Sequence, residues 1–326
     1  MRTELTDDPG AFRARDWNHL VDADPEGTFF HTPQYLKTWW EEFGQGGKLL
    51  LAFVADGDEP VAVCGFDRRG DRLTFLGGFD VTDYMGPVGA PGAEDRVAKE
   101  LVRAVTALEG WTRADLAGLP SEGRWLPALE TAAAEAGLGP ERGDDGVMPR
   151  LDLPPTFEEY EAGLPPKLRH EMRRKARRLE REAGGYELVP TTRQNLTVHV
   201  DRFVELHRSS EGPKGKFMYA GMELFFRHLA DDFVDEGTFR LTFLRAAGEL
   251  VAGAIAFRHK DAVYLYNSAF DHRFRQLSPG MVLVAELIRG AIEEGLSRFD
   301  MLKGDLEYKY RFGAVPRPVV RLALGR

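Results

Sequence analysis

A strand-and-turn pattern that occurs twice limits the folds open to this chain more than any other feature. Residues 49–79 read "LLLAFVADGDEPVAVCGFDRRGDRLTFLGGF", and residues 239–270 read "FRLTFLRAAGELVAGAIAFRHKDAVYLYNSAF". Each stretch contains three strand-like apolar runs joined by short turns such as "DGDE" and "AAGE". The spacing predicts a meander of three antiparallel strands in each half of the chain.

Further elements follow each predicted meander in the same order. After the first we expect a helix near 93–109, a strand at 113–119, a helix near 124–136 and a strand near 147–153. After the second we expect a helix at 279–295, a strand at 298–302, a short helical piece at 305–313 and a last strand at 318–324. The shared order favours an internal duplication of one α/β unit over a chance likeness of two meanders. Each unit should be a mixed, mainly antiparallel sheet flanked by helices.

The boundary between the two units is predicted in the Pro-containing segment that follows residue 150, which gives units of 1–153 and 154–326. No low-complexity tract or long linker is visible between them, so we expect the units to pack together and to leave a cleft. In the first unit, residues 32–44 carry the signals of a helix. Thr32 is a candidate cap, Pro33 suits the first helical position, and Gly44 suits the end.

Composition indicates a soluble protein with a sizeable core. The chain has 326 residues, of which 43% are hydrophobic, and its longest apolar runs are too short to cross a bilayer. The N-terminus has no basic-then-apolar signal pattern, so we expect a cytoplasmic protein without a membrane span. Cys64 is the one cysteine, and the eight histidines show no metal-ligand spacing. We therefore expect neither a disulfide nor a metal site.

Charge is distributed unevenly along the chain. The net charge is −9, with −12 on the first 150 residues and +3 on the rest. This asymmetry favours an anionic partner for the second half, although solubility alone would also explain an acidic first half.

A predicted helix at 166–183 concentrates the positive charge. Leu168, Met172, Ala176 and Leu179 fall on one side at helical spacing, so that side can dock while arginines such as Arg173 and Arg177 face outward. Glu–Arg pairs on a solvated face are the alternative, but they leave the excess of arginine unexplained. The helix is a candidate site for phosphates of coenzyme A, of a nucleotide-linked sugar or of an RNA. It has no interleaved aromatic residues, so base stacking is not indicated.

The segment before the helix at 279–295 is a candidate anion-binding loop. A helix N-terminus presents backbone N–H groups and a partial positive charge, which suit phosphate. An ordinary helix cap would explain Ser278 and Pro279, but not Arg273, Arg275 and Gln276 on the same link. The predicted loop, 273–281, offers Arg273, Arg275, Gln276, Leu277, Ser278, Pro279, Gly280 and Met281.

These elements together resemble a known fold. The order of three strands, basic loop, helix, strand and short helix is that of the Gcn5-related N-acetyltransferase (GNAT) fold. Arg275-x-x-Ser278-x-Gly280 resembles its pyrophosphate loop, Gln/Arg-x-x-Gly-x-Gly/Ala, with Ser in place of the central Gly. With "SPG" and "FDMLKGDLEYKYRFG", the chain resembles the acyltransferase family typified by the CelD protein of cellulose-production operons. The resemblance spans nearly the whole chain and is most specific over 160–313.

The resemblance implies roles for particular residues. The second unit would bind acetyl-CoA or another acyl-CoA, and the first would be a degenerate GNAT unit that shapes the acceptor site. Tyr308 would protonate the leaving thiolate, Lys303 would stabilise the oxyanion, and Asp271 is a further catalytic candidate. Asp83 and Tyr84 are candidates for gripping an amine or a hydroxyl of the acceptor. For each of these residues, a solvated or ion-paired surface position is the alternative.

The expected function is transfer of an acyl group from acyl-CoA to an amine of a sugar or small metabolite, in polysaccharide or cell-envelope metabolism. Direct attack on the thioester needs no covalent intermediate, so Cys64 is not expected to be a nucleophile. Two alternatives remain. The tandem architecture is similar to the FemABX enzymes, which add amino acids from aminoacyl-tRNA, so tRNA is a possible partner. The imperfect pyrophosphate loop would also fit a non-catalytic, anion-binding scaffold.

Overall fold

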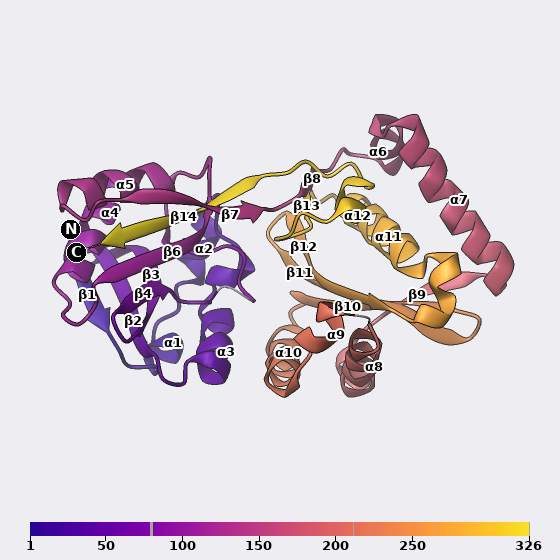
Figure 1. Ribbon diagram of the computed structural model, residues 1–326, viewed down its shortest axis with the longest axis horizontal. Coiled ribbons are helices and arrows are strands. Elements are labelled where there is room, and N and C mark those ends of the chain that lie inside the picture. The colour runs from indigo at the N-terminus through magenta and orange to yellow at the C-terminus, as the bar shows by residue number, and fades with distance from the viewer. Residues whose placement is uncertain (79–80, 211, 326) are drawn as a thin grey trace. The chain divides into compact units, whose positions relative to one another are not determined.

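The computed structural model describes residues 1–78, 81–210 and 212–325, which form two compact units (Figure 1). The first unit comprises Met1–Val147 together with Arg317–Arg326, and the second comprises Met148–Pro316. The sequence-based division at 153/154 differs in two ways. It assigns residues 148–153, which include a strand of the second sheet, to the first unit, and it assigns the last strand to the second unit. Chain order alone does not reveal which sheet a strand at the edge of a unit joins.

The first unit is an eight-stranded mixed sheet with helices. Its strands are β1 (Arg2–Thr6), β2 (Lys48–Asp56), β3 (Glu59–Arg69), β4 (Arg72–Phe75), β5 (Val88–Gly89), β6 (Arg113–Pro120), β7 (Glu141–Val147) and β14 (Pro318–Gly325). The helices are α1 (Ala11–Ala14), α2 (Asn18–Ala23), α3 (Pro33–Phe43), α4 (Glu94–Thr106) and α5 (Trp125–Glu135), with the 3-10 turn η1 (Phe29–His31). The strand order is β1-β2-β3-β4-β6-β14-β7, and β5 pairs with β3.

Helix α3 shows how local signals set an element. The Thr32 side chain accepts a hydrogen bond from the backbone N–H of Tyr35 at 3.3 Å, and Pro33 occupies the first turn, where an N–H would lack a helical partner. At the other end, the Gly44 N–H donates to the carbonyl of Trp40. The predicted start and end of this helix are confirmed.

The second unit repeats the arrangement with a six-stranded sheet. Its strands are β8 (Arg150–Asp152), β9 (Tyr186–Pro190), β10 (Phe239–Ala246), β11 (Glu249–His259), β12 (Ala262–Phe270) and β13 (Arg298–Asp300). The helices are α6 (Phe157–Gly163), α7 (Pro166–Ala183), α8 (Leu196–Arg208), α9 (Pro213–Phe217), α10 (Ala220–Phe233), α11 (Pro279–Glu293) and α12 (Glu307–Tyr310), with 3-10 turns η2 (Arg193–Asn195) and η3 (His272–Leu277). The strand order is β8-β13-β12-β11-β10-β9.

Helices cover both faces of the second sheet (Figure 1). On one face, α11 and α7 pack over an apolar cluster that includes Leu179, Leu283 and Ile288 from the helices and Ala254 and Leu265 from the strands. On the other face, α8 and α10 pack against the sheet, where aromatic rings of α10 and β12 meet. Both predicted meanders are present as antiparallel triplets, and the α/β class with mixed, mainly antiparallel sheets is confirmed.

The chain returns to the first unit for its last strand. Strand β14, at the C-terminal end of the sequence, lies between β6 and β7 of the first unit. In the second unit β8, which precedes most of that unit in sequence, pairs with β13, and Arg150 of β8 also bridges to Val315. Within the described ranges, no helix is long and apolar enough to cross a membrane.

Candidate functional site

The sheet of the second unit opens between two parallel strands. Strand β12 pairs with β13 only through Ala262–Tyr264, opposite Arg298–Asp300, although β12 itself continues to Phe270. Against β11, the β12 register shifts by one residue, so that Tyr266 is an extra residue on β12. A β-bulge of this kind bends its strand and increases the local twist. Past Tyr264 the two parallel strands therefore separate.

Helix α11 begins next to the end of β12. Ser278 precedes it with a φ of 53° and a ψ of 46°, a left-handed conformation that is uncommon for a residue with a side chain. The Ser278 carbonyl accepts from the N–H groups of Met281 and Val282, and no backbone acceptor is found for the Gly280 N–H within the described ranges. A Cβ added at Gly280 would lie 3.4 Å from the Phe270 ring, which shows how closely the helix end approaches β12.

The predicted anion-binding loop divides into side chains that point inward and side chains that are accessible. Leu277 and Met281 pack against the apolar core of the second unit. Arg275 and Gln276 are exposed, and among the described residues no side-chain partner is found for either. Arg275 and Gln276 are therefore the members of the loop whose polar groups are available to a ligand.

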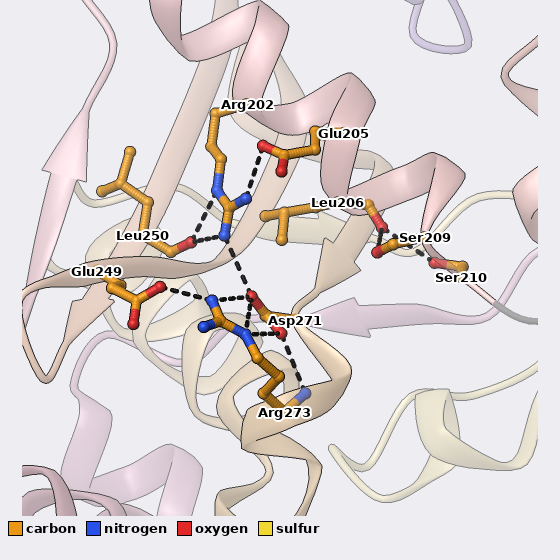
Figure 2. A network of polar contacts seen from close by, with 9 residues as sticks. All are labelled: Arg202, Glu205, Leu206, Ser209, Ser210, Glu249, Leu250, Asp271 and Arg273. Carbon is orange, nitrogen blue, oxygen red and sulfur yellow. Dashed lines mark hydrogen bonds and ion pairs between the residues drawn. The ribbon is translucent and has the colours of Figure 1, made fainter.

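Asp271 and Arg273 are held in a network of ion pairs (Figure 2). Both oxygens of Asp271 accept from the Arg273 guanidinium at 2.8–3.2 Å, and Arg202 of α8 donates to the same carboxylate at 3.3 Å. Arg273 also pairs with Glu249 at 2.5 Å. Hydrogen bonding from Arg273 is the main cause that lowers the pKa of Asp271 to about 2. A carboxylate this acidic is a weak base at neutral pH, so these contacts do not favour Asp271 as a catalytic base.

The turn after β13 is organised by a buried lysine. Leu302 has a φ of 55°, and its N–H donates to the Asp300 carboxylate at 2.8 Å. The Lys309 ammonium, from α12, donates to the carbonyls of Leu302 at 2.7 Å and Lys303 at 2.9 Å. Lys309 is only 3% exposed. Sequence inspection did not single out Asp300 or Lys309, because neither their spacing nor their neighbours distinguish a buried charged side chain from a solvated one.

Lys303 and Tyr308, the two leading catalytic candidates, lie at opposite ends of this turn. Lys303 is half-buried, and its carbonyl is fixed by Lys309. Tyr308 packs against the apolar cluster of the second unit, and burial raises the pKa of its phenol to about 12. The phenol therefore stays protonated at neutral pH, as a proton donor must, but the raised pKa also makes it a weaker acid than a free tyrosine. Both roles stay predictions.

Helix α7 docks through its apolar side and presents arginines outward. Met172 and Leu179 are buried in the second unit's core, as predicted. Arg173 forms a two-pronged ion pair with Glu161, at 2.7 and 3.0 Å, so part of its charge is already balanced. Arg177 donates to the carbonyl of Arg173 at 3.3 Å, which leaves most of its guanidinium accessible.

The remaining candidates lie in the first unit. Asp83 and Tyr84 are half-buried, and the Tyr84 ring lies 6.4 Å from that of Phe30. Tyr84 lines a small cavity of about 20 Å³, too small for more than a water molecule. Cys64 is 1% exposed, and burial raises its thiol pKa, which disfavours the nucleophilic thiolate. No cluster of potential metal ligands is found in the described part of the chain.

Comparison with family models gives a match within the second unit. Residues 166–310 match the family model of the "Acetyltransferase (GNAT) domain", the kind of domain expected from the resemblance to CelD-like proteins. No curated protein sequence matches the chain.

Solved structures resemble the fold over nearly the whole chain. A conserved protein of unknown function from Bacteroides thetaiotaomicron is 14% identical, with 99% of each chain covered and a TM-score of 0.67. FemX is 11% identical, with a TM-score of 0.64 and coverage of 98% of this chain and 97% of that one. A tandem GNAT protein from the clavulanic acid biosynthesis pathway is 13% identical, with a TM-score of 0.50 and coverage of 99% and 98%. The predicted tandem GNAT fold is confirmed.

Proposed function

We propose that the second unit transfers an acyl group, with acetyl the expected one, from acyl-CoA to an amine of a sugar or small metabolite in polysaccharide or cell-envelope metabolism. The observation that carries the proposal is the separation of β12 from β13 beside the N-terminus of α11. The match to an acetyltransferase (GNAT) domain supports an acyltransferase.

The loop has features that suit the phosphates of coenzyme A. The N-terminus of a fifteen-residue helix favours an anion, and the Gly280 N–H there has no backbone acceptor within the described ranges. Arg275 and Gln276 are exposed at the same end. The thioester arm would then follow β12 toward the point where β13 separates from it.

The chemistry that we propose is direct transfer. The unprotonated amine attacks the thioester carbon, the carbon–sulfur bond breaks, and the amine proton passes to solvent. Backbone N–H groups of β12 past Tyr264, together with Lys303, would stabilise the negative charge on the carbonyl oxygen. Tyr308 would give its proton to the departing thiolate. Cys64, which is buried, has no part in the reaction.

Calorimetric titration with coenzyme A tests the donor site. Arg275→Ala removes a charge-assisted contact and should weaken binding about tenfold or more. Gly280→Val places a branched side chain against Phe270 and over the helix end, so it should weaken binding as well. Arg13→Ala, at an exposed arginine of the first unit, is the control and should bind normally. Unchanged affinity in both loop variants would contradict the assignment.

A second candidate function is transfer from aminoacyl-tRNA. The exposed arginines of α7 favour it, as does the fold shared with FemX. Thermal-shift measurements with acetyl-CoA, longer acyl-CoAs and aminoacyl-tRNA distinguish the candidates, because a ligand stabilises the protein that binds it. Stabilisation by acyl-CoA alone is the expected result, and no response to any of these donors would favour a non-catalytic scaffold.

A further inference from the structure

We propose that Arg202 and Asp271 are positioning residues for the donor-binding loop, and that Arg273 is a structural clamp of this loop rather than a phosphate ligand. The inference rests on the proposed function, since it concerns the site for coenzyme A. It reassigns Asp271 and Arg273, which the sequence favoured as a catalytic residue and a direct ligand.

Asp271 connects three segments that are distant in sequence (Figure 2). Its backbone N–H donates to the Val251 carbonyl of β11 at 2.8 Å, and its carboxylate accepts from the Arg273 N–H at 3.0 Å, which caps η3. Arg202 of α8 reaches the same carboxylate and also donates twice to the Leu250 carbonyl, at 3.0 and 3.2 Å. One carboxylate therefore ties α8, the start of β11 and the loop together.

Each arginine of this network is already paired with two carboxylates. The Arg273 guanidinium pairs with Asp271 and Glu249, and Arg202 pairs with Asp271 and Glu205. An arginine held by two carboxylates has little net charge to offer a phosphate. If Arg273 turned toward a phosphate, it would leave these carboxylates without their partner. Arg275, two residues further on, has no such partner among the described residues.

The position of this network explains how it would act on the ligand. Asp271 is the cap at the start of η3, and Ser278 ends η3 and begins α11. The direction in which η3 leaves β12 therefore decides where Arg275, Gln276 and the Gly280 N–H point. Because Arg202 and Asp271 fix that direction, their loss should misplace the ligand-binding groups without removing any of them.

The test is a titration with coenzyme A, followed by steady-state kinetics with acetyl-CoA. Arg202→Met and Asp271→Asn should raise the Kd and the KM for the donor about tenfold, with turnover at saturating donor within about threefold of the unaltered protein. Arg193→Met is the matched control. It removes two ion pairs, with Asp231 at 2.9 Å and Asp235 at 2.7 Å, in the turn that precedes α8, and it should change neither constant.

Salt dependence separates a clamp from a ligand. A cation that contacts phosphate makes coenzyme A binding weaken as salt rises, because ions screen the attraction. Arg275→Met should therefore reduce the salt dependence of the Kd, whereas Arg273→Met should weaken binding and leave that dependence unchanged. A reduced salt dependence in Arg273→Met would overturn its assignment as a clamp.

The outcomes also separate this inference from the proposed function. A hundredfold loss of turnover in Asp271→Asn with a normal Kd would make Asp271 catalytic and overturn the positioning role. Normal coenzyme A binding by Arg202→Met and Asp271→Asn, with binding by the unaltered protein intact, would overturn the inference alone. Failure of the unaltered protein to bind coenzyme A would overturn the proposed function and the inference together.

Discussion

Lys309 places a positive charge inside the second unit, and its contacts explain why it is tolerated there. Its ammonium is desolvated, but two backbone carbonyls at the end of the β13 turn accept its hydrogen bonds. A buried charge is acceptable only when such partners satisfy it. The same bonds hold Leu302 in its left-handed conformation and fix the backbone of Lys303.

Lys309→Met should therefore destabilise the second unit. The substitution keeps the apolar stem but removes the hydrogen bonds to both carbonyls, so it should lower the free energy of unfolding by about 2–3 kcal/mol. Urea unfolding followed by far-UV circular dichroism measures this loss. Lys167→Met is the control, since that side chain is exposed in the first turn of α7. Equal stability of both variants would show that the ammonium does not hold the turn.

Lys303 and Tyr308 are expected to affect rate rather than stability. An oxyanion donor acts on charge that develops in the transition state, so Lys303→Met should lower turnover by about 10²–10³-fold with normal coenzyme A affinity. Tyr308→Phe should have a smaller effect, least with donors whose thiolate leaves easily. Full activity of Lys303→Met would show that Lys303 has no catalytic role, and that backbone N–H groups alone stabilise the oxyanion.

The pH dependence offers a separate check on Tyr308. Burial raises the pKa of its phenol to about 12, above the usual value near 10, so the fold favours the neutral form. The stability due to this effect is present below pH 10 and is lost as pH rises through about 12. Turnover should accordingly show no ionisation of this tyrosine below about pH 10, and a Tyr308-dependent fall near pH 9 would contradict the assignment.

At the scale of elements, the sequence predicted regular structure well and irregular structure poorly. The bounds of helix α3 could be predicted from the sequence, because its cap, proline and terminal glycine are local signals. The bulge at Tyr266 and the left-handed Ser278 were not recoverable, because distant contacts impose them on residues that local preference places elsewhere. The Asp271 network escaped prediction for the same reason, since Arg202 lies on another helix.

Helix α7 carries the clearest prediction at this scale. Charge reversal at Arg173, Arg174 and Arg177 should preserve the fold, because Met172 and Leu179 make the core contacts. If tRNA binds there, the affinity of the unaltered protein should fall steeply with salt through counterion release, and the reversed variant should not bind. Fluorescence anisotropy with labelled tRNA measures both. Absence of binding by the unaltered protein at low salt would remove tRNA as a partner.

At the scale of the whole molecule, the first unit is completed by the last strand of the sequence, which the order of elements did not reveal. The repeated meanders indicated two units, yet β14 follows the second unit in sequence and completes the sheet of the first. Its buried residues, Val319, Leu322 and Leu324, would suit either sheet. β14 pairs with β6 on one side and with β7 on the other. These pairings join residues that are far apart in sequence, so a single sequence does not predict them.

Removal of residues 317–326 should consequently unfold the first unit while the second retains its sheet. The deletion takes Val319, Leu322 and Leu324 from the core and leaves β6 and β7 without their shared partner, a loss of more than about 4 kcal/mol from buried apolar surface alone. All five tryptophans lie in the first 125 residues, so their fluorescence reports on the first unit. Far-UV circular dichroism should show that much of the structure persists.

Gly325→Ala, at an open position of the same strand, is the control and should unfold like the unaltered protein. An unchanged tryptophan transition after the deletion would show that β14 is not needed by the first unit's sheet.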